Sequence, residues 1–305
     1  MKILITGGSG MVGKNIVELL KKKGFNVLHP TSHKLNLLDK GAFKNYILKT
    51  NPEMIIHCAG KVGGIAANIK NPVNFLYENT QLSLNILISS YEAGIKNLIN
   101  LSSSCMYPKN IKNPLSENSI LSGVLEPTNE GYALAKLTST KLCEYINKEN
   151  KDFKYKTIIP CNLYGRYDKF DSNNSHMIPA VIKKIHEAKI KNLNIIDIWG
   201  DGQVRREFMY VEDLADFIYY AIQKFELLPQ NMNVGLGHDL TIDEYYKKIA
   251  EVIGYNGEFN HDLSKPIGMK KKLLNNRKQI KFGWKYKTSL LEGIQKTYDF
   301  YLNEN

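Results

Sequence analysis

Short apolar runs alternate with longer amphipathic stretches along the whole chain. Five runs rich in isoleucine, valine and leucine have the pattern of buried parallel strands, at 2–6, 54–58, 97–101, 155–159 and 195–199. Apolar residues at helical spacing predict helices near 13–23, 79–93, 132–147, 175–188, 212–224, 242–253 and 289–302. This alternation predicts an α/β fold with a Rossmann-type, doubly wound parallel sheet and a smaller C-terminal α/β domain.

A loop-like stretch at 164–174 divides the predicted elements into two groups. A length of 305 residues suggests two domains or one large one, and this division favours two. Residues 1–165 are predicted to bind a cofactor, with a return segment near 205–235, and residues 166–305 mainly to bind the substrate.

Charge and composition narrow the class of protein. The chain has 41 basic and 30 acidic residues, a net charge of +11, which favours an anionic partner. Only four of the basic residues are arginine, so a solvated lysine surface is the simpler interpretation of most of the charge. The sequence has no apolar run long enough for a membrane span and no secretory signal, so we expect a cytoplasmic protein that binds no membrane. The four cysteines lack the spacing of a disulfide scaffold or a metal site.

A glycine-rich loop follows the first strand directly. It reads Thr-Gly-Gly-Ser-Gly-Met-Val-Gly over 6–13 and is followed by a helix pattern. Gly7, Gly10 and Gly13 permit a tight turn, close approach of the backbone to a pyrophosphate, and close packing of helix on strand. With both flanking elements present, the loop predicts a dinucleotide site rather than a structural turn.

The residues after Val27-Leu28, where the second strand of such a fold should end, indicate which dinucleotide binds. NAD enzymes usually place an acid there to bind the ribose 2′-hydroxyl. This chain has no carboxylate at that point, and Ser32, His33 or Lys34 could bind a 2′-phosphate, which favours NADPH. Asp39 is a candidate adenine contact, with a helix cap as the alternative.

Two further motifs predict a site for hydride transfer. Tyr132 and Lys136 lie four residues apart on one helical face, and the lysine charge is expected to lower the pKa of the phenol. Ser103 follows the strand at 97–101, at the sheet edge where such folds bind ligands. A tyrosine, a lysine and a serine at one edge predict proton exchange with a ketone or alcohol oxygen.

Taken together, these motifs resemble the extended short-chain dehydrogenase/reductases that act on nucleotide sugars, and within them the GDP-L-fucose synthases. The segments that carry the resemblance run nearly end to end and keep the family's order: KVGGI at 61–65, SSCMYP at 103–108, LEPTNE at 125–130, NLYG at 162–165, NSH at 174–176, WG at 199–200, REF at 206–208 and KLL at 272–274.

The resemblance implies a role for each matching residue. Ser103, Tyr132 and Lys136 would form the reductase triad, and Cys105 and His176 would be the acid/base pair for epimerisation. A C4 ketone acidifies the protons on C3 and C5, so such a pair could remove and return them. NADPH would then reduce the ketone of a GDP-linked 4-keto sugar, and a homodimer that binds no nucleic acid is expected.

The same resemblance completes the expected binding sites. The predicted cofactor residues are Gly7, Gly10, Met11, Val12, Gly13, Asp39, Tyr132, Lys136, Asn162, Leu163 and His176. The predicted substrate residues are Lys184 and Arg206 at the pyrophosphate, Trp199 with Met177, Val181 and Ile198 around the guanine, and Lys272. No metal ligand is expected.

Several positions depart from the family pattern and are expected near the sugar or the nucleotide. Gly131 replaces a proline, Tyr210 replaces a histidine, and Ile267 and Met269 replace an aspartate and a threonine. These changes leave the identity of the sugar open between GDP-4-keto-6-deoxy-mannose and a related 4-keto heptose.

Other functions share parts of these motifs. A GDP-sugar C4-reductase without epimerase activity would keep the triad, and a nucleotide-sugar 4-epimerase or dehydratase would recycle bound NAD. A non-catalytic, NADP-sensing Rossmann regulator would need the glycine loop alone, although such proteins commonly lose the Tyr-Lys pair that is present here.

Overall fold

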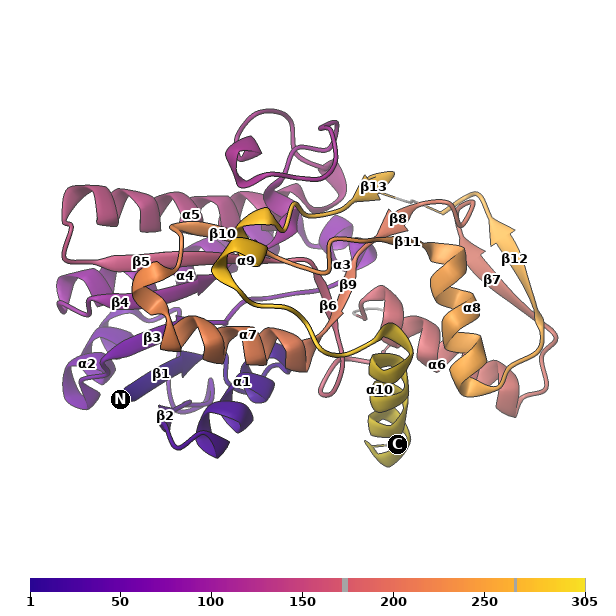
Figure 1. The fold of residues 1–305 in the computed structure, drawn as a ribbon, viewed down its shortest axis with the longest axis horizontal. Helices are drawn as coiled ribbons and strands as arrows, with labels where there is room; N and C mark the ends of the chain where they lie inside the picture. Colours follow the sequence, from indigo (N-terminus) through magenta and orange to yellow (C-terminus); the bar gives the residue numbers. More distant parts are fainter. Residues whose placement is uncertain (172–174, 266–267, 305) are drawn as a thin grey trace.

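The computed structural model describes residues 1–171, 175–265 and 268–304. Six parallel strands form its main sheet, in the order β10-β5-β4-β3-β1-β2 (Figure 1). Their bounds are β1 (Lys2–Thr6), β2 (Asn26–Leu28), β3 (Met54–His57), β4 (Asn97–Leu101), β5 (Lys154–Pro160) and β10 (Asn231–Val234). The predicted α/β class with a parallel central sheet is therefore confirmed.

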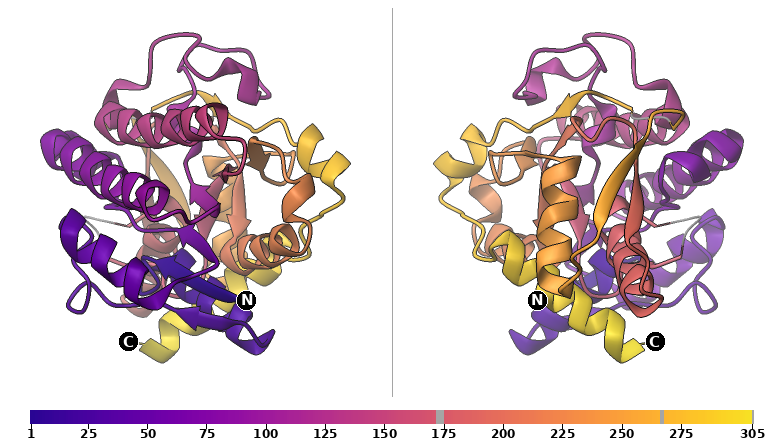
Figure 2. Two further views of the ribbon diagram at one scale, coloured as in Figure 1. Left: turned by 90° about the vertical axis from the view of Figure 1, so that its left-hand side faces the viewer. Right: turned by 90° about the vertical axis from the view of Figure 1, so that its right-hand side faces the viewer.

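Helices cover both faces of this sheet (Figure 2). Ile3 and Ile5 of β1 point into one apolar core and Leu4 into the other, because successive side chains of a strand alternate between faces. The first core is closed by α1 (Met11–Lys22), α7 (Val211–Gln223) and α9 (Arg277–Phe282), and the second by α2 (Lys40–Thr50), α4 (Pro72–Glu92) and α5 (Glu130–Glu149). The short α3 (Ile65–Lys70) precedes α4.

A second lobe has its own core, at the end opposite α2 in Figure 1. It contains α6 (Met177–Ile190), α8 (Ile242–Ile253) and α10 (Leu290–Glu304), with β7 (Ile195–Trp199) paired to β12 (Glu258–Asp262). Two small sheets lie where the lobes meet: β6 (Asn162–Tyr164) with β9 (Phe208–Tyr210), and β8 (Arg205–Arg206) between β11 (Leu240–Thr241) and β13 (Lys271–Lys272). Single turns of 3₁₀-helix are η1 (Ser104–Met106), η2 (Glu117–Ser119), η3 (Pro127–Asn129) and η4 (Phe225–Leu227).

Four of the five predicted strands lie in the main sheet, and the prediction for the fifth was wrong in one respect. The run at 195–199 forms β7, but its side chains alternate between exposed and buried, and it pairs with β12 alone. A two-stranded sheet has one face on the lobe's core and one face in solvent, so only Ile196 and Ile198 are buried. The apolar pattern did not reveal α2, whose apolar side is weak, or the short strand β10, and β2 ends at Leu28, where the second strand was expected to end.

The chain returns to the first lobe after position 205. Helix α7 packs beside α1, and β10 becomes an edge strand of the main sheet next to β5. Within the described residues, no helix is long and apolar enough to cross a membrane.

The glycine loop between β1 and α1 is the tightest packing in the first lobe. Gly7 has φ +71°, and a Cβ on it would lie 2.6 Å from the Cα of Ala59. A Cβ on Gly13 would collide with the carbonyl oxygen of Gly7. Gly10 differs, because its nearest neighbour would lie 3.6 Å away, an ordinary contact. The fold therefore needs glycine at positions 7 and 13, and position 10 has room for a methyl group.

This difference predicts distinct effects of two alanine substitutions. Gly13→Ala should lower the free energy of unfolding by about 2 kcal/mol or more, because the loop and α1 must move apart. Gly10→Ala should change the free energy of unfolding little and instead weaken NADPH binding, because the methyl group would stand where the pyrophosphate approaches the backbone. Urea unfolding and NADPH titration of both variants measure the two effects. Equal unfolding free energies would contradict this account of the loop.

Candidate active site

Most of the predicted cofactor and triad residues lie at or near the carboxyl edge of the main sheet. The chain runs from β1 to β2 on one side and then crosses to β3 on the other, so the strand order reverses between β1 and β3. Open α/β sheets bind ligands in the crevice at such a point. Strands of the main sheet are followed, within two residues of their carboxyl ends, by Gly7, Cys58, Ser103 and Asn162.

The start of α1 has the features of a phosphate site. Met11 and Val12 open the helix, and among the described residues no side chain caps it at Gly10. The first amide N–H groups of a helix have no partner within the helix and attract anions. The residues present therefore fit a dinucleotide: the uncapped helix end faces the loop whose backbone the glycines leave open.

The segment after β2 carries cations where an NAD enzyme carries an acid. His29 packs on the glycine loop, since a Cβ on Gly8 would lie 2.7 Å from the His29 Cβ. Lys21 Nζ lies 2.7 Å from His29 Nε2, and burial followed by this lysine lowers the pKa of His29. Ser32, His33 and Lys34 are exposed in the turn that follows. This group of basic side chains suits a 2′-phosphate. Lys21 and His29 belong to the group but were not predicted from the sequence.

Asp39 is the N-cap of α2. Its carboxylate accepts a hydrogen bond of 2.9 Å from the amide of Ala42, which is the capping role that the sequence analysis considered as the alternative. The adenine contact stays a prediction.

The residues of the predicted reductase triad come from α5 and the end of β4. Tyr132 and Lys136 lie one turn apart on α5, and the ammonium of Lys136 lies 5.8 Å from the centre of the Tyr132 ring. Lys136 Nζ donates a hydrogen bond of 2.8 Å to the carbonyl oxygen of Leu101, the last residue of β4. The Ser103 hydroxyl, two residues further on, interacts with the Tyr132 phenol. The structure thus brings together the three residues that the sequence predicted.

The pKa of Tyr132 differs from the expectation. Burial raises it above its usual value, the nearby Cys105 raises it further, and the hydrogen bond from Ser103 lowers it. The expected net lowering of this pKa by Lys136 is therefore wrong, because burial dominates. The Lys136 ammonium donates its hydrogen bond to the Leu101 carbonyl. A phenol with a raised pKa stays protonated at neutral pH, which suits a residue that gives a proton to a ketone oxygen.

Burial lowers the pKa of Lys136 to about 8, against the opposing influence of Cys58 and Cys105. The side chain is 5% exposed, so water cannot stabilise its charge.

Asn79 of α4 holds the loop next to Lys136. Its side-chain amide accepts a hydrogen bond from the N–H of Lys61 and donates one to the carbonyl of Lys61. A Cβ on Gly60 would lie 3.1 Å from Asn79 Oδ1 and 3.7 Å from Lys136 Nζ.

Cys105 lies among polar and cationic groups beside the triad. Asn129 Nδ2 donates to its sulfur at 3.3 Å, and Lys272 Nζ lies 3.7 Å from the same atom. Asn129 comes from η3, before α5, and Lys272 from β13, in the C-terminal part of the chain. This thiol is half-buried, unlike the fully buried Cys143. Its surroundings are therefore those of a reactive cysteine rather than of a small apolar core residue.

His176 begins α6 at the base of the second lobe. It is the N-cap residue, but its side chain makes no capping hydrogen bond. The preceding residue reaches the active-site edge, since a Cβ on Gly64 would lie 2.9 Å from the Ser175 carbonyl oxygen. Burial, and secondarily Lys169, lowers the pKa of His176, so the imidazole is neutral at pH 7. Within the described residues, no hydrogen bond joins His176 to Cys105, and their joint role stays a prediction. Asn174, in the same motif, lies outside the described residues.

The predicted substrate residues lie on the second lobe and at its junction with the first. Trp199 is 48% exposed at the end of β7, so it is a surface ring rather than a core residue. Val181 and Ile198, expected near the guanine, are instead buried in the lobe's core. Lys184 of α6 donates to the carbonyl of Asp197.

Arg206 lies on β8 and is partly buried. Its guanidinium donates 2.6 Å and 2.9 Å hydrogen bonds to the carbonyls of Met269 and Arg205. Burial lowers the pKa of Arg206 to about 10, against the opposing influences of Cys105 and Glu126. The influence of Cys105 indicates that the Arg206 guanidinium lies near the Cys105 thiol.

Asn162 and Leu163 form the beginning of β6, directly after β5. Asn162 Nδ2 donates a 3.0 Å hydrogen bond to the carbonyl of Glu207, which joins β6 to the Arg206 segment. The predicted contact of Asn162 and Leu163 with the nicotinamide stays a prediction.

Two departures from the family pattern have packing consequences. A Cβ on Gly131 would lie 2.9 Å from the carbonyl oxygen of Pro72, so glycine lets α5 approach the start of α4. A pocket of about 220 Å³ opens there and reaches Asn129 and Tyr132. Tyr210 is buried and packs on Tyr164, with ring centres 5.8 Å apart, in the core of the second lobe. Ile267 lies outside the described residues.

Asn79 and Asn129 were not predicted from the sequence, and neither was Asp239, which lies 2.8 Å from Arg205 Nε beside β8. Asn129 lies inside the LEPTNE segment, which is the signal that could have found it. Asn79 and Asp239 have no distinguishing pattern around them. In the described parts of the chain, no group of three or more His, Cys, Asp and Glu residues could hold a metal ion.

Comparison with known proteins adds independent findings. Over 304 residues the chain is 58% identical to the GDP-L-colitose synthase of Yersinia pseudotuberculosis, covering all of this chain and 99% of that one. It is 48% identical to the GDP-L-fucose synthase of Azorhizobium caulinodans, covering 100% and 97% of the two chains. A solved GDP-6-OMe-4-keto-L-xylo-heptose reductase from C. jejuni matches with a TM-score of 0.92 and 31% identity, over 100% of this chain and 98% of that chain.

A GDP-mannoheptose C4 reductase from Campylobacter jejuni, solved with NADP bound, matches with a TM-score of 0.89 and 31% identity, over 99% of this chain and 98% of that chain. Residues 3–235 match the model of the NAD dependent epimerase/dehydratase family. The resemblance drawn from the motifs is therefore confirmed, and the chain belongs to the NAD dependent epimerase/dehydratase family.

Proposed function

We propose that this protein is an NADPH-dependent oxidoreductase that reduces the C4 ketone of a GDP-linked 4-keto sugar and also epimerises the sugar next to the ketone. The proposal rests on one observation: the predicted reductase triad and the predicted acid/base thiol are close together at the carboxyl edge of the main sheet. The triad of Ser103, Tyr132 and Lys136 lies beside the glycine loop, and the Cys105 thiol, with its neighbours Asn129 and Lys272, adjoins the triad.

Reduction uses the phenol of Tyr132 as the acid. NADPH, when bound, supplies the hydride to C4. Tyr132 donates its proton to the C4 oxygen as charge develops there, and Ser103 offers a second hydrogen bond to the same oxygen. Lys136 is anchored to the Leu101 carbonyl and holds a positive charge below the phenol. Gly7, Gly10, Gly13 and the start of α1 hold the cofactor's phosphates.

Epimerisation uses the acidity of the carbons next to the ketone. We assign the proton exchange to Cys105 and His176: one removes a proton from C5 or C3 and the other returns a proton to the opposite face. Lys272 and Asn129 support the thiol, and the neutral imidazole of His176 is able to accept a proton at pH 7.

The comparisons favour a deoxyhexose over a heptose as the sugar. The two relatives with 58% and 48% identity are named for GDP-L-colitose and GDP-L-fucose, and the heptose reductases share 31% identity with this chain. Arg206, Lys184 and the exposed Trp199 would bind the GDP part, in keeping with the affinity of guanidinium groups for phosphates. The four free cysteines fit a reducing compartment, and we place the enzyme in the cytoplasm.

An exposed apolar surface supports the expected homodimer. Helices α4 and α5 lie side by side and expose large apolar side chains to solvent: Val73, Leu76, Tyr77, Leu134 and Tyr145. Val73 is 74% and Tyr77 61% exposed. Because monomers rarely expose such clusters, we propose that a second copy of the chain covers this α4–α5 face.

The central test separates reduction from proton exchange in purified protein. We expect NADPH oxidation with GDP-4-keto-6-deoxy-mannose or its 3-deoxy analogue, and slower oxidation with a 4-keto heptose. Tyr132→Phe should abolish NADPH oxidation but keep deuterium uptake from D2O at C5. Cys105→Ser should lower deuterium uptake by a factor of about 100 or more, because the acid/base group is lost. Mass spectrometry and NMR of the products measure both.

Three outcomes would contradict the proposal or parts of it. No oxidation with any of these sugars would refute the reductase. Full exchange in Cys105→Ser and His176→Gln would leave a C4-reductase without epimerase activity. Bound NAD that turns over with no external cofactor would indicate a recycling 4-epimerase.

The pKa of Lys136 predicts how reduction depends on pH. Because burial lowers this pKa to about 8, the ammonium is present below pH 8 and is lost as the pH rises through it. The pKa of Tyr132 is raised, so the phenol stays protonated over the same range. The kcat/KM for the sugar should therefore fall above about pH 8, since kcat/KM reports the free enzyme. Lys136→Arg, which keeps its charge, should move this fall to higher pH. An unchanged profile in that variant would exclude Lys136 as its cause.

Charge placed on the α4–α5 face should separate the dimer. Tyr77→Glu and Val73→Glu should give monomers in size-exclusion chromatography with light scattering, because a buried unpaired carboxylate is costly at an interface. Leu227→Glu is the matched control, because Leu227 is 73% exposed on η4, outside this face. A wild-type monomer, or dimers in both glutamate variants, would contradict the assignment.

A further inference from the structure

The strands β8 and β13 carry four cations in two facing pairs. Their register sets Lys271 opposite Arg205 and Lys272 opposite Arg206. Each strand has only two residues. Like charges on directly facing positions weaken strand pairing. A sheet this short, with like charges across it, needs an additional interaction to hold its register.

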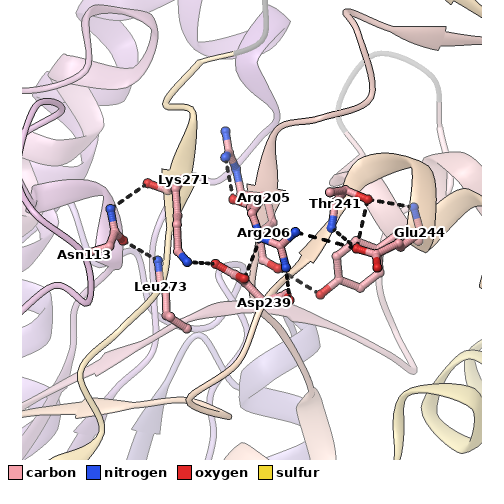
Figure 3. Close-up of polar contacts among 9 residues, drawn as sticks. Asn113, Arg205, Arg206, Asp239, Thr241, Glu244, Lys271 and Leu273 are labelled. Atoms are coloured by element: carbon pink, nitrogen blue, oxygen red, sulfur yellow. Dashed lines mark hydrogen bonds and ion pairs between the residues drawn. The ribbon is translucent and has the colours of Figure 1, made fainter.

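Asp239 supplies that interaction for the first pair (Figure 3). Its carboxylate lies 2.8 Å from Arg205 Nε and 3.1 Å from Lys271 Nζ, and its carbonyl accepts a further 2.8 Å hydrogen bond from Arg205. The Asp239 side chain is 5% exposed, and the pKa of this carboxyl is lowered by the two cations despite its burial. One buried carboxylate therefore joins both strands through one cation from each.

The second pair has the opposite orientation, because side chains alternate along a strand. In Figure 3 the Arg206 guanidinium points away from Asp239, whereas the Arg205 guanidinium ends against it. Lys272 reaches the Cys105 sulfur at 3.7 Å, and Cys105 also acts electrostatically on Arg206. The two faces of the β8–β13 pair thus differ: one contacts the Asp239 carboxylate, and the other lies next to the Cys105 thiol.

A loop from the first lobe holds the other side of β13. The Asn113 amide donates to the Lys271 carbonyl at 3.4 Å and accepts from the Leu273 amide at 2.9 Å. The Leu115 amide donates to the Leu273 carbonyl at 2.7 Å. These bonds fix β13 to the first lobe, while Asp239 links it to β8. The position of Lys272 relative to Cys105 therefore depends both on the Asn113 and Leu115 hydrogen bonds and on the Asp239 contacts.

We propose that Asp239 is a positioning residue for the active site: by pairing with Arg205 and Lys271 it fixes β13 on β8, and so sets Arg206 and Lys272 at the thiol and the substrate diphosphate. This inference rests on the proposed function for the identity of the substrate. The position of Lys272 beside Cys105 does not depend on that identity.

The test compares Asp239→Asn with the double variant Asp239→Asn/Lys271→Met. Asn keeps the shape of Asp239 and removes its charge, so the KM for the GDP-4-keto sugar should rise by about tenfold or more, as expected when binding groups are misplaced. The KM for NADPH should stay within about twofold, because the glycine loop is untouched. Removing Lys271 in the double variant takes away one of the repelling cations and should restore at least half of the loss.

A second readout needs no substrate. The rate at which iodoacetamide alkylates Cys105, followed by peptide mass spectrometry, should fall by about threefold or more in Asp239→Asn, because a nearby ammonium makes a cysteine more reactive and Lys272 would no longer lie 3.7 Å from the sulfur. Glu251→Gln is the matched control, since Glu251 pairs with Lys248 on the exposed side of α8 in the same lobe and should leave both readouts unchanged.

Each outcome decides the inference. A rise in the sugar KM with slower alkylation and recovery in the double variant supports it. Unchanged alkylation, an equal rise in both KM values, or a double variant no better than the single one overturns it. If the wild-type enzyme reduces no GDP-4-keto sugar, the proposed function fails, and the alkylation rates still decide whether Asp239 positions Lys272.

Discussion

The hydrogen bond from the buried Lys136 ammonium to the Leu101 carbonyl is the interaction on which the active site depends. It joins α5 to the last residue of β4, at the point where the chain leaves the sheet. Because Tyr132 lies one turn before Lys136, and Ser103 two residues after Leu101, this one bond sets both oxygen-bearing side chains at the same place. The cost of burying the charge appears in the pKa of Lys136, lowered to about 8. The site thus holds a cation that water cannot screen next to a phenol that stays protonated.

Where the lobes meet, buried carboxylates join segments that are far apart in the sequence. Glu207 is fully buried, and its oxygens accept hydrogen bonds from the amides of Leu236, Gly237 and Leu274. Burial raises its pKa to about 7 against these bonds, which lower it. With Asp239, it ties the segment that contains Arg206 to the end of β10 and to the residues after β13. A buried carboxylate whose oxygens are all bonded fixes several loops at once, because any displacement would leave charge unpaired.

These features change the meaning of the net charge of +11. Most of the lysines form exposed ion pairs or face solvent, such as Lys40 and Lys44 with Glu92. Pairs of this kind contribute little to stability. The cations assigned to the proposed site are few: Lys136 and Lys272 are buried, and Arg206 is partly buried. Function therefore depends on where a charge is buried rather than on how many charges the chain has.

The sequence by itself determined the parts that depend on neighbouring residues. Apolar runs predicted four of the six strands of the main sheet, the glycine spacing predicted the phosphate loop, and a four-residue spacing placed Tyr132 and Lys136 on one helical face. It could not determine that 195–199 pairs outside the main sheet, that burial rather than Lys136 governs the pKa of Tyr132, or that Asp239 joins Arg205 to Lys271. Those features depend on desolvation and on contacts between residues far apart in the chain, such as the 167 positions that separate Cys105 from Lys272. Local spacing fixes which side chains share a helix or strand, and only tertiary packing decides which charges lose their water and which partners replace it.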